Sequence, residues 1–134
     1  DGAASNNNLD MLEEMRLAAL LHKVSSYNPV AVPAVTAINM ATANGAEALG
    51  LGKKIGKLKA GYKADIVLIN MDKLHWQPRH DRASLLVYAA AASDVDTVLV
   101  NGKVLLADGR LTTIDEERLV AEVEKRAARL TGKI

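Results

Sequence analysis

The start of the chain carries apolar side chains at helical spacing. Leu and Met recur every three or four positions between residues 9 and 21 and cover more than one face. This pattern predicts a helix over residues 9–23 that is buried on two sides. We expect Asn7 or Asn8 to cap this helix by accepting hydrogen bonds from its first N–H groups.

Two shorter helices are predicted next. Pro33 is tolerated in the first turn of a helix, so we predict a helix over residues 33–44. Gly45 should end or kink it, and a third short helix should cover residues 46–49 before Gly50.

The pattern changes after Gly52, where a turn-rich basic segment precedes short β-branched runs. Residues 64–70 form an apolar run typical of a buried strand. Residues 95–100 and 103–107 are apolar runs joined by Asn101-Gly102, which predicts a hairpin because both turn positions need a positive φ.

Two more helices are predicted in the second half of the chain, over residues 82–92 and 115–130. Thr113 and Glu116 have the spacing of a capping box at the start of the last helix. That helix carries one apolar stripe on a charged background, made of Leu119, Val120, Val123, Ala127 and Leu130.

Composition narrows the function classes. The chain has 134 residues, enough for one ordinary domain but too few for a complete eight-stranded α/β barrel of about 250 residues. Its 17 basic and 16 acidic residues give a net charge of +1, so we expect no nucleic-acid and no membrane partner. Cysteine is absent, which excludes disulfides and Cys-ligated zinc and is compatible with the cytoplasmic location that we expect.

The opening segment offers the leading candidate for chemistry. Asp1 stands on a small Gly-containing turn that runs into a helix, as a catalytic acid does at the mouth of a barrel strand. Such a carboxylate can ligate a divalent metal and relay a proton, or it can be a plain turn residue. Ser5 could bind substrate or cap the helix. We expect the chain to be the back end of a larger enzyme.

Other polar residues give weaker signals. His22, His75 and His80 lack the spacing of a self-contained zinc site. Asp65 stands at the start of an apolar run, where we expect it to accept a hydrogen bond from backbone N–H groups.

A resemblance to a known family is carried by several segments. Residues 56–69 resemble the G-x-L-x-x-G-x-x-A-D-I/L-V signature of the cyclic-amidine and nucleobase branch of the amidohydrolase superfamily. Residues 41–51 and 98–104 are similar to the helix pair and the late hairpin of that branch. The opening Asp-Gly-Ala-Ala-Ser-Asn-Asn resembles the metal-site loop of methylthioadenosine/S-adenosylhomocysteine deaminases and triazine chlorohydrolases, and residues 80–88 are also similar to that subgroup.

The resemblance implies an α/β fold in the whole enzyme: a metal-dependent hydrolase TIM barrel with a small β-sandwich. This chain would supply the last βα unit, the trailing helices and part of the sandwich, and would be α+β if seen alone. Residues 1–52 would be the tail of the barrel, residues 53–110 part of the sandwich with an inserted helix, and residues 111–134 a helix packing back on the barrel.

The resemblance also implies a reaction, in which a metal-bound hydroxide attacks an amidine ring and releases ammonia or another leaving group. Asp1 matches the family's metal-ligating aspartate and Ser5 a position near the substrate. The divalent metal, zinc or iron, is also held by histidines that match nothing in this chain. We therefore expect the chain alone to hold no metal and to be inactive.

Three functions remain open at this stage. We expect a part of a hydrolytic deaminase of an adenine-type nucleoside. A chlorohydrolase or guanine-type deaminase of the same superfamily is an alternative, and an inactive fragment that acts only in assembly is another. Because apolar helix faces would lack partners, we expect a homo-oligomer or a companion fragment besides the small-molecule substrate.

Overall fold

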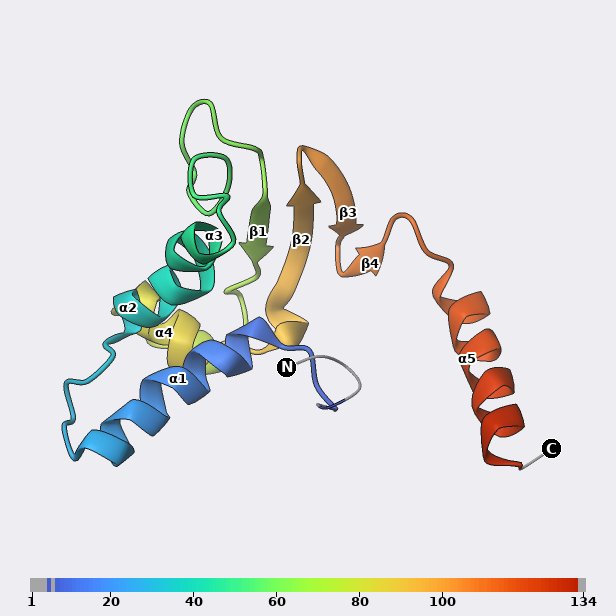
Figure 1. Cartoon of the computed structure of the whole chain (residues 1–134), viewed down its shortest axis with the longest axis horizontal. Helices are drawn as coiled ribbons and strands as arrows, with labels where there is room; N and C mark the ends of the chain where they lie inside the picture. Colours follow the sequence, from blue (N-terminus) through green and yellow to red (C-terminus); the bar gives the residue numbers. More distant parts are fainter. Residues whose placement is uncertain (1–4, 6, 133–134) are drawn as a thin grey trace.

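Figure 1 shows the computed structural model of the chain, which describes residue 5 and residues 7–132. A group of packed helices lies beside an antiparallel sheet, and a last helix stands apart from both. This mixture of helices and a small sheet agrees with the α+β appearance that the sequence predicts for the chain seen alone. No helix among the described residues is long and apolar enough to cross a bilayer.

The first helix, α1, spans Met11–Ser26. Its cap is Asp10, whose Oδ1 accepts hydrogen bonds from the N–H groups of Leu12 and Glu13 at 2.9 and 3.3 Å. The prediction of Asn7 or Asn8 as the cap is therefore wrong. The helix begins two residues later than predicted, and Asp10, with extended backbone, is the residue whose carboxylate reaches its first N–H groups.

Three helical segments follow without a break: α2 (Ala34–Asn39), the π-helix η1 (Met40–Asn44) and α3 (Gly45–Ala48). Gly45 keeps a helical φ of −58°, so it does not end the helix as predicted. The irregularity lies before it instead, in the wider turn of η1. Gly50, with a φ of 71°, lies beyond the end of α3.

The core lies where α1, α2 and α4 (Arg82–Tyr88) meet. Its buried members are Met15, Ala19, Ala34, Ala37 and Val87. Three of the five are alanines, whose small side chains allow the helices to approach closely. None of these five residues is aromatic, and the buried Trp76 is not among them. The prediction that α1 is buried on two sides is not met here, because several of its apolar side chains are exposed.

The sheet has the order β1-β2-β3-β4, with antiparallel neighbours throughout. Its strands are β1 (Ile66–Ile69), β2 (Val95–Val100), β3 (Lys103–Ala107) and β4 (Arg110–Leu111). Asn101 and Gly102 join β2 to β3 with φ values of 51° and 79°, which confirms the predicted hairpin turn.

Strand β1 is uncovered on both faces. Val67 and Leu68 are neighbours in the strand and so point to opposite faces, yet they are 54% and 51% exposed. Apolar side chains on both faces of a strand are typical of a sheet that is covered on both sides.

The last helix, α5, spans Glu116–Thr131 and contains no buried residue. Its cap is Asp115, which accepts from the N–H of Arg118 at 3.0 Å, so the predicted capping box at Thr113 is wrong. Glu116 instead turns back and accepts from the N–H of Leu111 at 3.0 Å. Figure 1 shows α5 reached by a short connection from β4 and separated from the other helices.

Candidate functional site

The two residues predicted to carry the chemistry are not brought into a site by the described part of the chain. Asp1 lies outside the described residues. Ser5 is described and is exposed. Within residue 5 and residues 7–132, no group of three or more His, Cys, Asp or Glu side chains could hold a metal ion. The described residues alone therefore do not fit a divalent metal, and no chemical step is derived through one.

The three histidines have different surroundings. His22 and His80 are exposed. His75 lies on the short 3-10 helix η2 (Leu74–Trp76), and its Nε2 donates to Oδ2 of Asp94 at 2.8 Å. That contact leads to the most elaborate polar cluster of the described structure.

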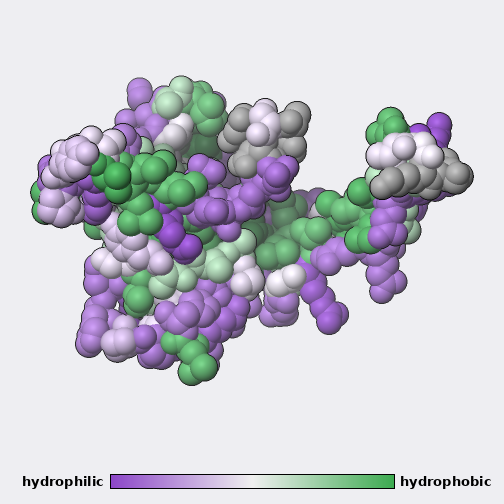
Figure 2. Space-filling view, turned by 90° about the horizontal axis from the view of Figure 1, so that it is seen from below, coloured by the Kyte–Doolittle hydropathy of each residue, from purple (hydrophilic) through white to green (hydrophobic). Residues whose placement is uncertain are grey.

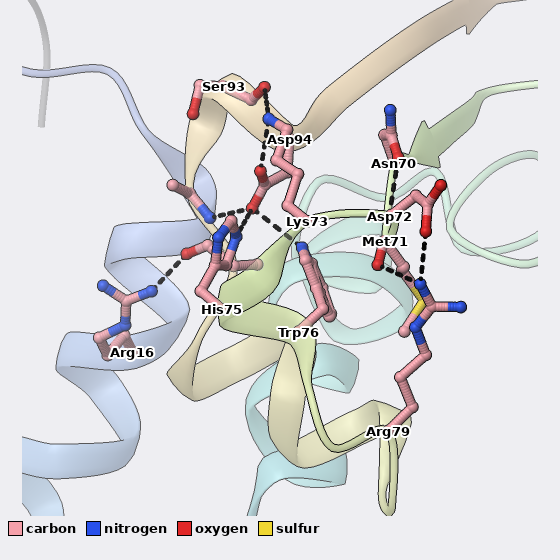
Figure 3. Close-up of polar contacts among 12 residues, drawn as sticks. Arg16, Asn70, Met71, Asp72, Lys73, His75, Trp76, Arg79, Ser93 and Asp94 are labelled. Carbon is pink, nitrogen blue, oxygen red and sulfur yellow. Dashed lines mark hydrogen bonds and ion pairs between the residues drawn. The ribbon is translucent and has the colours of Figure 1, made fainter.

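Asp94 is a fully buried carboxylate at the centre of this cluster (Figure 3). It ends the 3-10 helix η3 (Ala92–Asp94), directly before β2. Besides His75, its donors are Nζ of Lys73 at 2.8 Å, Nε1 of Trp76 at 3.3 Å and the N–H of Ala91 at 3.0 Å. Lys73 donates to Oδ1 and the other three donors reach Oδ2, so both carboxylate oxygens have partners.

Two opposing effects set the pKa of Asp94. Burial by itself would raise it, because a desolvated carboxylate is costly. The hydrogen bonds from Lys73, Ala91 and His75 outweigh burial and hold the pKa of the Asp94 carboxyl well below its usual range. Asp94 is thus a charged group whose two carboxylate oxygens are both hydrogen-bonded within the chain, and we assign it a structural role.

The Asp94 cluster joins segments that are distant in sequence. Lys73 also donates to the carbonyl of Ser93 at 2.8 Å, and the backbone carbonyl of Asp94 accepts from the N–H of Asn70 at 2.7 Å. The loop after β1 is thereby fixed to the start of β2. Trp76, the one tryptophan of the chain, is buried at this junction.

Arg16 connects α1 to the same region. Its Nε donates to the carbonyl of Val87 at 3.2 Å, and its Nη2 donates to the carbonyl of Ala90. These carbonyls lie at the C-terminal end of α4, where helical partners are lacking. Helix α4 stops at Tyr88, earlier than the predicted residue 92, because Ala91 is extended at the start of η3.

The signature segment has a structural explanation in its two glycines and its aspartate. A Cβ on Gly56 would lie 2.7 Å from Cβ of Ala46 and 2.9 Å from the carbonyl oxygen of Thr42, so the loop passes directly against η1 and α3. Gly61 has a φ of 86° but open space around it. Asp65 accepts from the N–H of Asn101 at 2.6 Å, which confirms its predicted backbone-binding role.

An apolar groove of about 240 Å³ lies between α1 and the α2–η1 segment. It is lined by Met11, Glu14, Met15, Ala18, Ala37, Met40 and Ala41. Its polar contribution is a single carboxylate, so the groove has the character of a packing surface and not of a catalytic site.

Sequence reasoning missed the Asp94 cluster. Asp94 lies in a Ser-Asp-Val segment that reads as an ordinary strand start, and Lys73 and His75 are about 20 positions away. The one available signal was the lone Trp in a polar loop, because a buried indole N–H needs an acceptor.

Residues 1–105 of the 134-residue chain match the amidohydrolase family. The chain belongs to the amidohydrolase family. This confirms the resemblance carried by the signature segment and the late hairpin.

Relatives of this amidohydrolase chain have consistent names. It is 56% identical over 133 residues to the 5-methylthioadenosine/S-adenosylhomocysteine deaminase of Pelotomaculum thermopropionicum, covering 99% of this chain and 30% of the relative. It is 54% identical to the deaminase of the same name from Dictyoglomus turgidum, with 99% and 31% covered. The chain thus spans about 30% of the length of these curated relatives.

Solved structures agree. An adenosine deaminase from Xanthomonas campestris with bound zinc has a TM-score of 0.95 and 39% identity, over 98% of this chain and 30% of its own. An atrazine chlorohydrolase from Arthrobacter aurescens complexed with zinc has a TM-score of 0.81 and 35% identity, over 92% and 28%.

Proposed function

We propose that this chain is the C-terminal part of a metal-dependent amidohydrolase that hydrolytically deaminates an adenine-type nucleoside. The observation that carries this proposal is the match over nearly the whole chain to deaminases, at 56% identity in sequence and a TM-score of 0.95 in structure. Two independent comparisons therefore lead to the same reaction class. Fold analogy alone would not do so, because one fold hosts many reactions.

In this proposal the opening loop belongs to the metal site. Asp1 is one ligand of a divalent metal, zinc or iron, and Ser5 lies near the substrate. Of this loop, Ser5 is described and is exposed, and α1 begins at Met11. The remaining ligands are carried by polypeptide that the relatives have and this chain lacks.

The chain by itself is proposed to be inactive. Zinc sites in proteins take three or more protein ligands, and the described residues contain no group of three. A single carboxylate at residue 1 cannot replace such a group. Binding of metal and activity would both require the rest of the enzyme.

The uncovered surfaces support a barrel-and-sandwich parent. We propose that residues 1–52 form the tail of a TIM barrel, residues 53–110 part of a composite β-sandwich with an inserted helix, and residues 111–134 a helix that packs back on the barrel. The open groove beside α1 and the two exposed faces of β1 are the surfaces that the missing polypeptide would cover.

Chlorohydrolysis is the second candidate, favoured by the structural match to the atrazine chlorohydrolase at a TM-score of 0.81. The same type of site could release chloride instead of ammonia, because the leaving group is chosen by substrate contacts. The higher similarity to deaminases places this candidate second.

A chimera tests the proposal directly. The part of the Pelotomaculum thermopropionicum relative that this chain does not cover is joined to the chain in the relative's order. We expect this chimera to deaminate 5-methylthioadenosine, which ultraviolet absorbance follows, and the chain alone to be inactive. Turnover of atrazine in place of the nucleoside would favour the second candidate.

Two variants of the chimera serve as a matched pair. Asp1→Asn removes the proposed ligand, and we expect loss of activity by a factor of about 1,000 or more. Asp10→Asn changes a nearby carboxylate that caps α1, and Asn is an equally good cap, so its activity should stay within about twofold. Equal activity of the two variants would refute the role of Asp1.

A further inference from the structure

Four consecutive alanines follow helix α4 without continuing it. Residues 89–92 are all alanine, the residue with the highest helix propensity, and the sequence predicts a helix as far as residue 92. The helix nevertheless ends at Tyr88, and Ala91 is extended, with a φ of −126° and a ψ of 158°. Because the local sequence favours more helix, contacts from elsewhere in the chain must hold this segment in its non-helical form.

Two charged side chains divide the hydrogen bond that would extend α4. In a longer helix the N–H of Ala91 would donate to the carbonyl of Val87, four positions earlier. Asp94 takes the donor instead, because its Oδ2 accepts from the N–H of Ala91 at 3.0 Å. Arg16 takes the acceptor, because its Nε donates to the carbonyl of Val87 at 3.2 Å. Each half of the missing helical bond is therefore satisfied by a charge from another element.

The same two charges bind opposite sides of one peptide group (Figure 3). Nη2 of Arg16 donates to the carbonyl of Ala90, and Asp94 accepts from the N–H of the same Ala90–Ala91 peptide. A cation at the carbonyl and an anion at the N–H polarise the peptide in the same direction, so each bond strengthens the other. Arg16 and Asp94 thus form a pair that is joined by this peptide.

These contacts lie inside the chain. Asp94 is fully buried, and Val87 and Ala90 are 0% and 1% exposed. The exposed apolar surfaces are different, for example the link to α5 on which Figure 2 shows apolar atoms, because this chain does not define what covers them. The contacts of Arg16 and Asp94 are complete whatever covers those surfaces.

We propose that Arg16 is a positioning residue that, together with Asp94, holds residues 89–92 out of α4 and so fixes α1 to the start of β2. Without the guanidinium, the carbonyl of Val87 loses a partner, and the N–H of Ala91 is the donor that a further helical turn supplies. Asp94 can release this N–H because it keeps its three side-chain donors. Helix α4 then continues through Ala91.

Such an extension of α4 moves α1 relative to the sheet. A residue that changes from extended to helical shortens the chain by about 2 Å, and only residues 92–94 separate Ala91 from β2. Helix α1 packs on α4 and follows the opening loop. The effect on the reaction rests on the proposed function, in which this loop belongs to the metal site. A displacement of about 1 Å can cost about 100-fold in rate.

Backbone chemical shifts of the full chain test the first step. Arg16→Met removes the donors and keeps a long side chain of good helix propensity. We expect the carbon shifts of Ala90 and Ala91 to move to helical values in this variant. Arg16→Lys can reach one carbonyl but not both, so it should give a smaller shift in the same direction. Arg82→Met, at an exposed arginine of α4, should change nothing. Unchanged shifts in both Arg16 variants would overturn the proposal.

A rescue distinguishes this role from a simple loss of packing. Ala91→Thr places a β-branched residue, which disfavours helix, at an exposed and extended position. Combined with Arg16→Met, it restores none of the lost hydrogen bonds. We nevertheless expect it to return the shifts of Ala90 to those of the unmodified chain. Helical shifts that persist in the double variant would contradict the proposed competition.

Kinetics of the chimera test the positioning role. We expect Arg16→Met to lower kcat at least about tenfold while KM stays within about threefold, because a displaced metal ligand affects the transition state more than substrate binding. Adding Ala91→Thr should restore kcat to within about threefold of the unmodified chimera. Arg82→Met should keep both constants within about twofold. Circular dichroism at the assay temperature checks that each variant is folded.

The outcomes separate this proposal from the proposed function. An unmodified chimera without deaminase activity refutes the proposed function, and the chemical shifts of the chain still decide whether Arg16 holds residues 89–92. An active chimera whose kcat is unchanged by Arg16→Met overturns the positioning role and leaves the proposed function intact.

Discussion

Helices α1 and α5 both carry apolar side chains, but only α1 is packed against other helices of the described chain. α1 buries Met15 and Ala19 against α2 and α4, and its Arg16 reaches the last carbonyls of α4. α5 has the same length of 16 residues and buries none. The amphipathic pattern of α5 is clear, yet the described chain contains nothing that covers it.

This difference separates what the chain can stabilise by itself from what needs another polypeptide. The packed helices α1, α2 and α4 and the Asp94 cluster are held by contacts within the chain. The apolar faces of α5 and β1 are not. Changes in the first region should therefore alter the stability of the chain, while changes in the second should alter only association.

The largest effect is expected where the signature loop touches η1 and α3. Gly56→Ala adds a methyl group that overlaps Ala46 and the Thr42 carbonyl, and it also strains a φ of 85°. We expect a loss of about 3–4 kcal/mol in the free energy of unfolding, measured with urea. Gly61→Ala also strains a positive φ, but the space around Gly61 is open, so we expect a loss of only about 1 kcal/mol in the free energy of unfolding. Equal losses would contradict the close packing.

The Asp94 cluster should give the next largest effect. Asp94→Asn leaves Lys73 and His75 without their carboxylate, although both are partly exposed and can be rehydrated. We expect a loss of about 2–3 kcal/mol at neutral pH. Asp72→Asn removes an exposed pair with Arg79 and should cost about 0.5 kcal/mol or less.

The Asp94 carboxylate should also determine how the free energy of unfolding falls at acid pH. The folded-state pKa of Asp94 is depressed, so its contribution is complete above the unfolded pKa of about 4 and is lost as the pH falls below that value. Urea unfolding at a series of pH values from about 6 to 3 should show a shallower decline for Asp94→Asn than for the unmodified chain. Parallel declines would show that Asp94 does not contribute.

The smallest effect is expected for an Ala→Leu substitution that is made once in α1 and once in α5. Ala19→Leu forces a larger side chain between α1, α2 and α4 and should cost about 2 kcal/mol. Ala121→Leu makes the same change on the exposed surface of α5 and should alter the free energy of unfolding by less than about 0.5 kcal/mol. Both are measured at one protein concentration, since association adds stability.

The elements that depend on local chemistry were predictable from the sequence. The turn at Asn101-Gly102, the strands on either side of it and the backbone role of Asp65 follow from residues close together in the chain. Errors arose at helix ends, where several residues can cap. The helix caps are Asp10 and Asp115, and not the predicted Asn7, Asn8 and Thr113. The choice of cap depends on the backbone path, which the periodicity of the sequence does not define.

The Asp94 cluster lay beyond sequence reasoning for a different reason. Its members are separated by about 20 positions and meet only because η2 and η3 turn toward each other. The proposed metal site has the opposite character. Asp1 is assigned to it from a motif alone, and the proposal places the other ligands on the part of the relatives that this chain does not cover.

The most direct test of the account is the metal content of purified proteins after dialysis against a weak chelator. We expect tightly bound zinc or iron in stoichiometric amount in the chimera and in its Asp10→Asn variant. The Asp1→Asn chimera and the chain alone should be nearly metal-free. Stoichiometric metal in the chain alone, or its full retention in the Asp1→Asn chimera, would contradict the account.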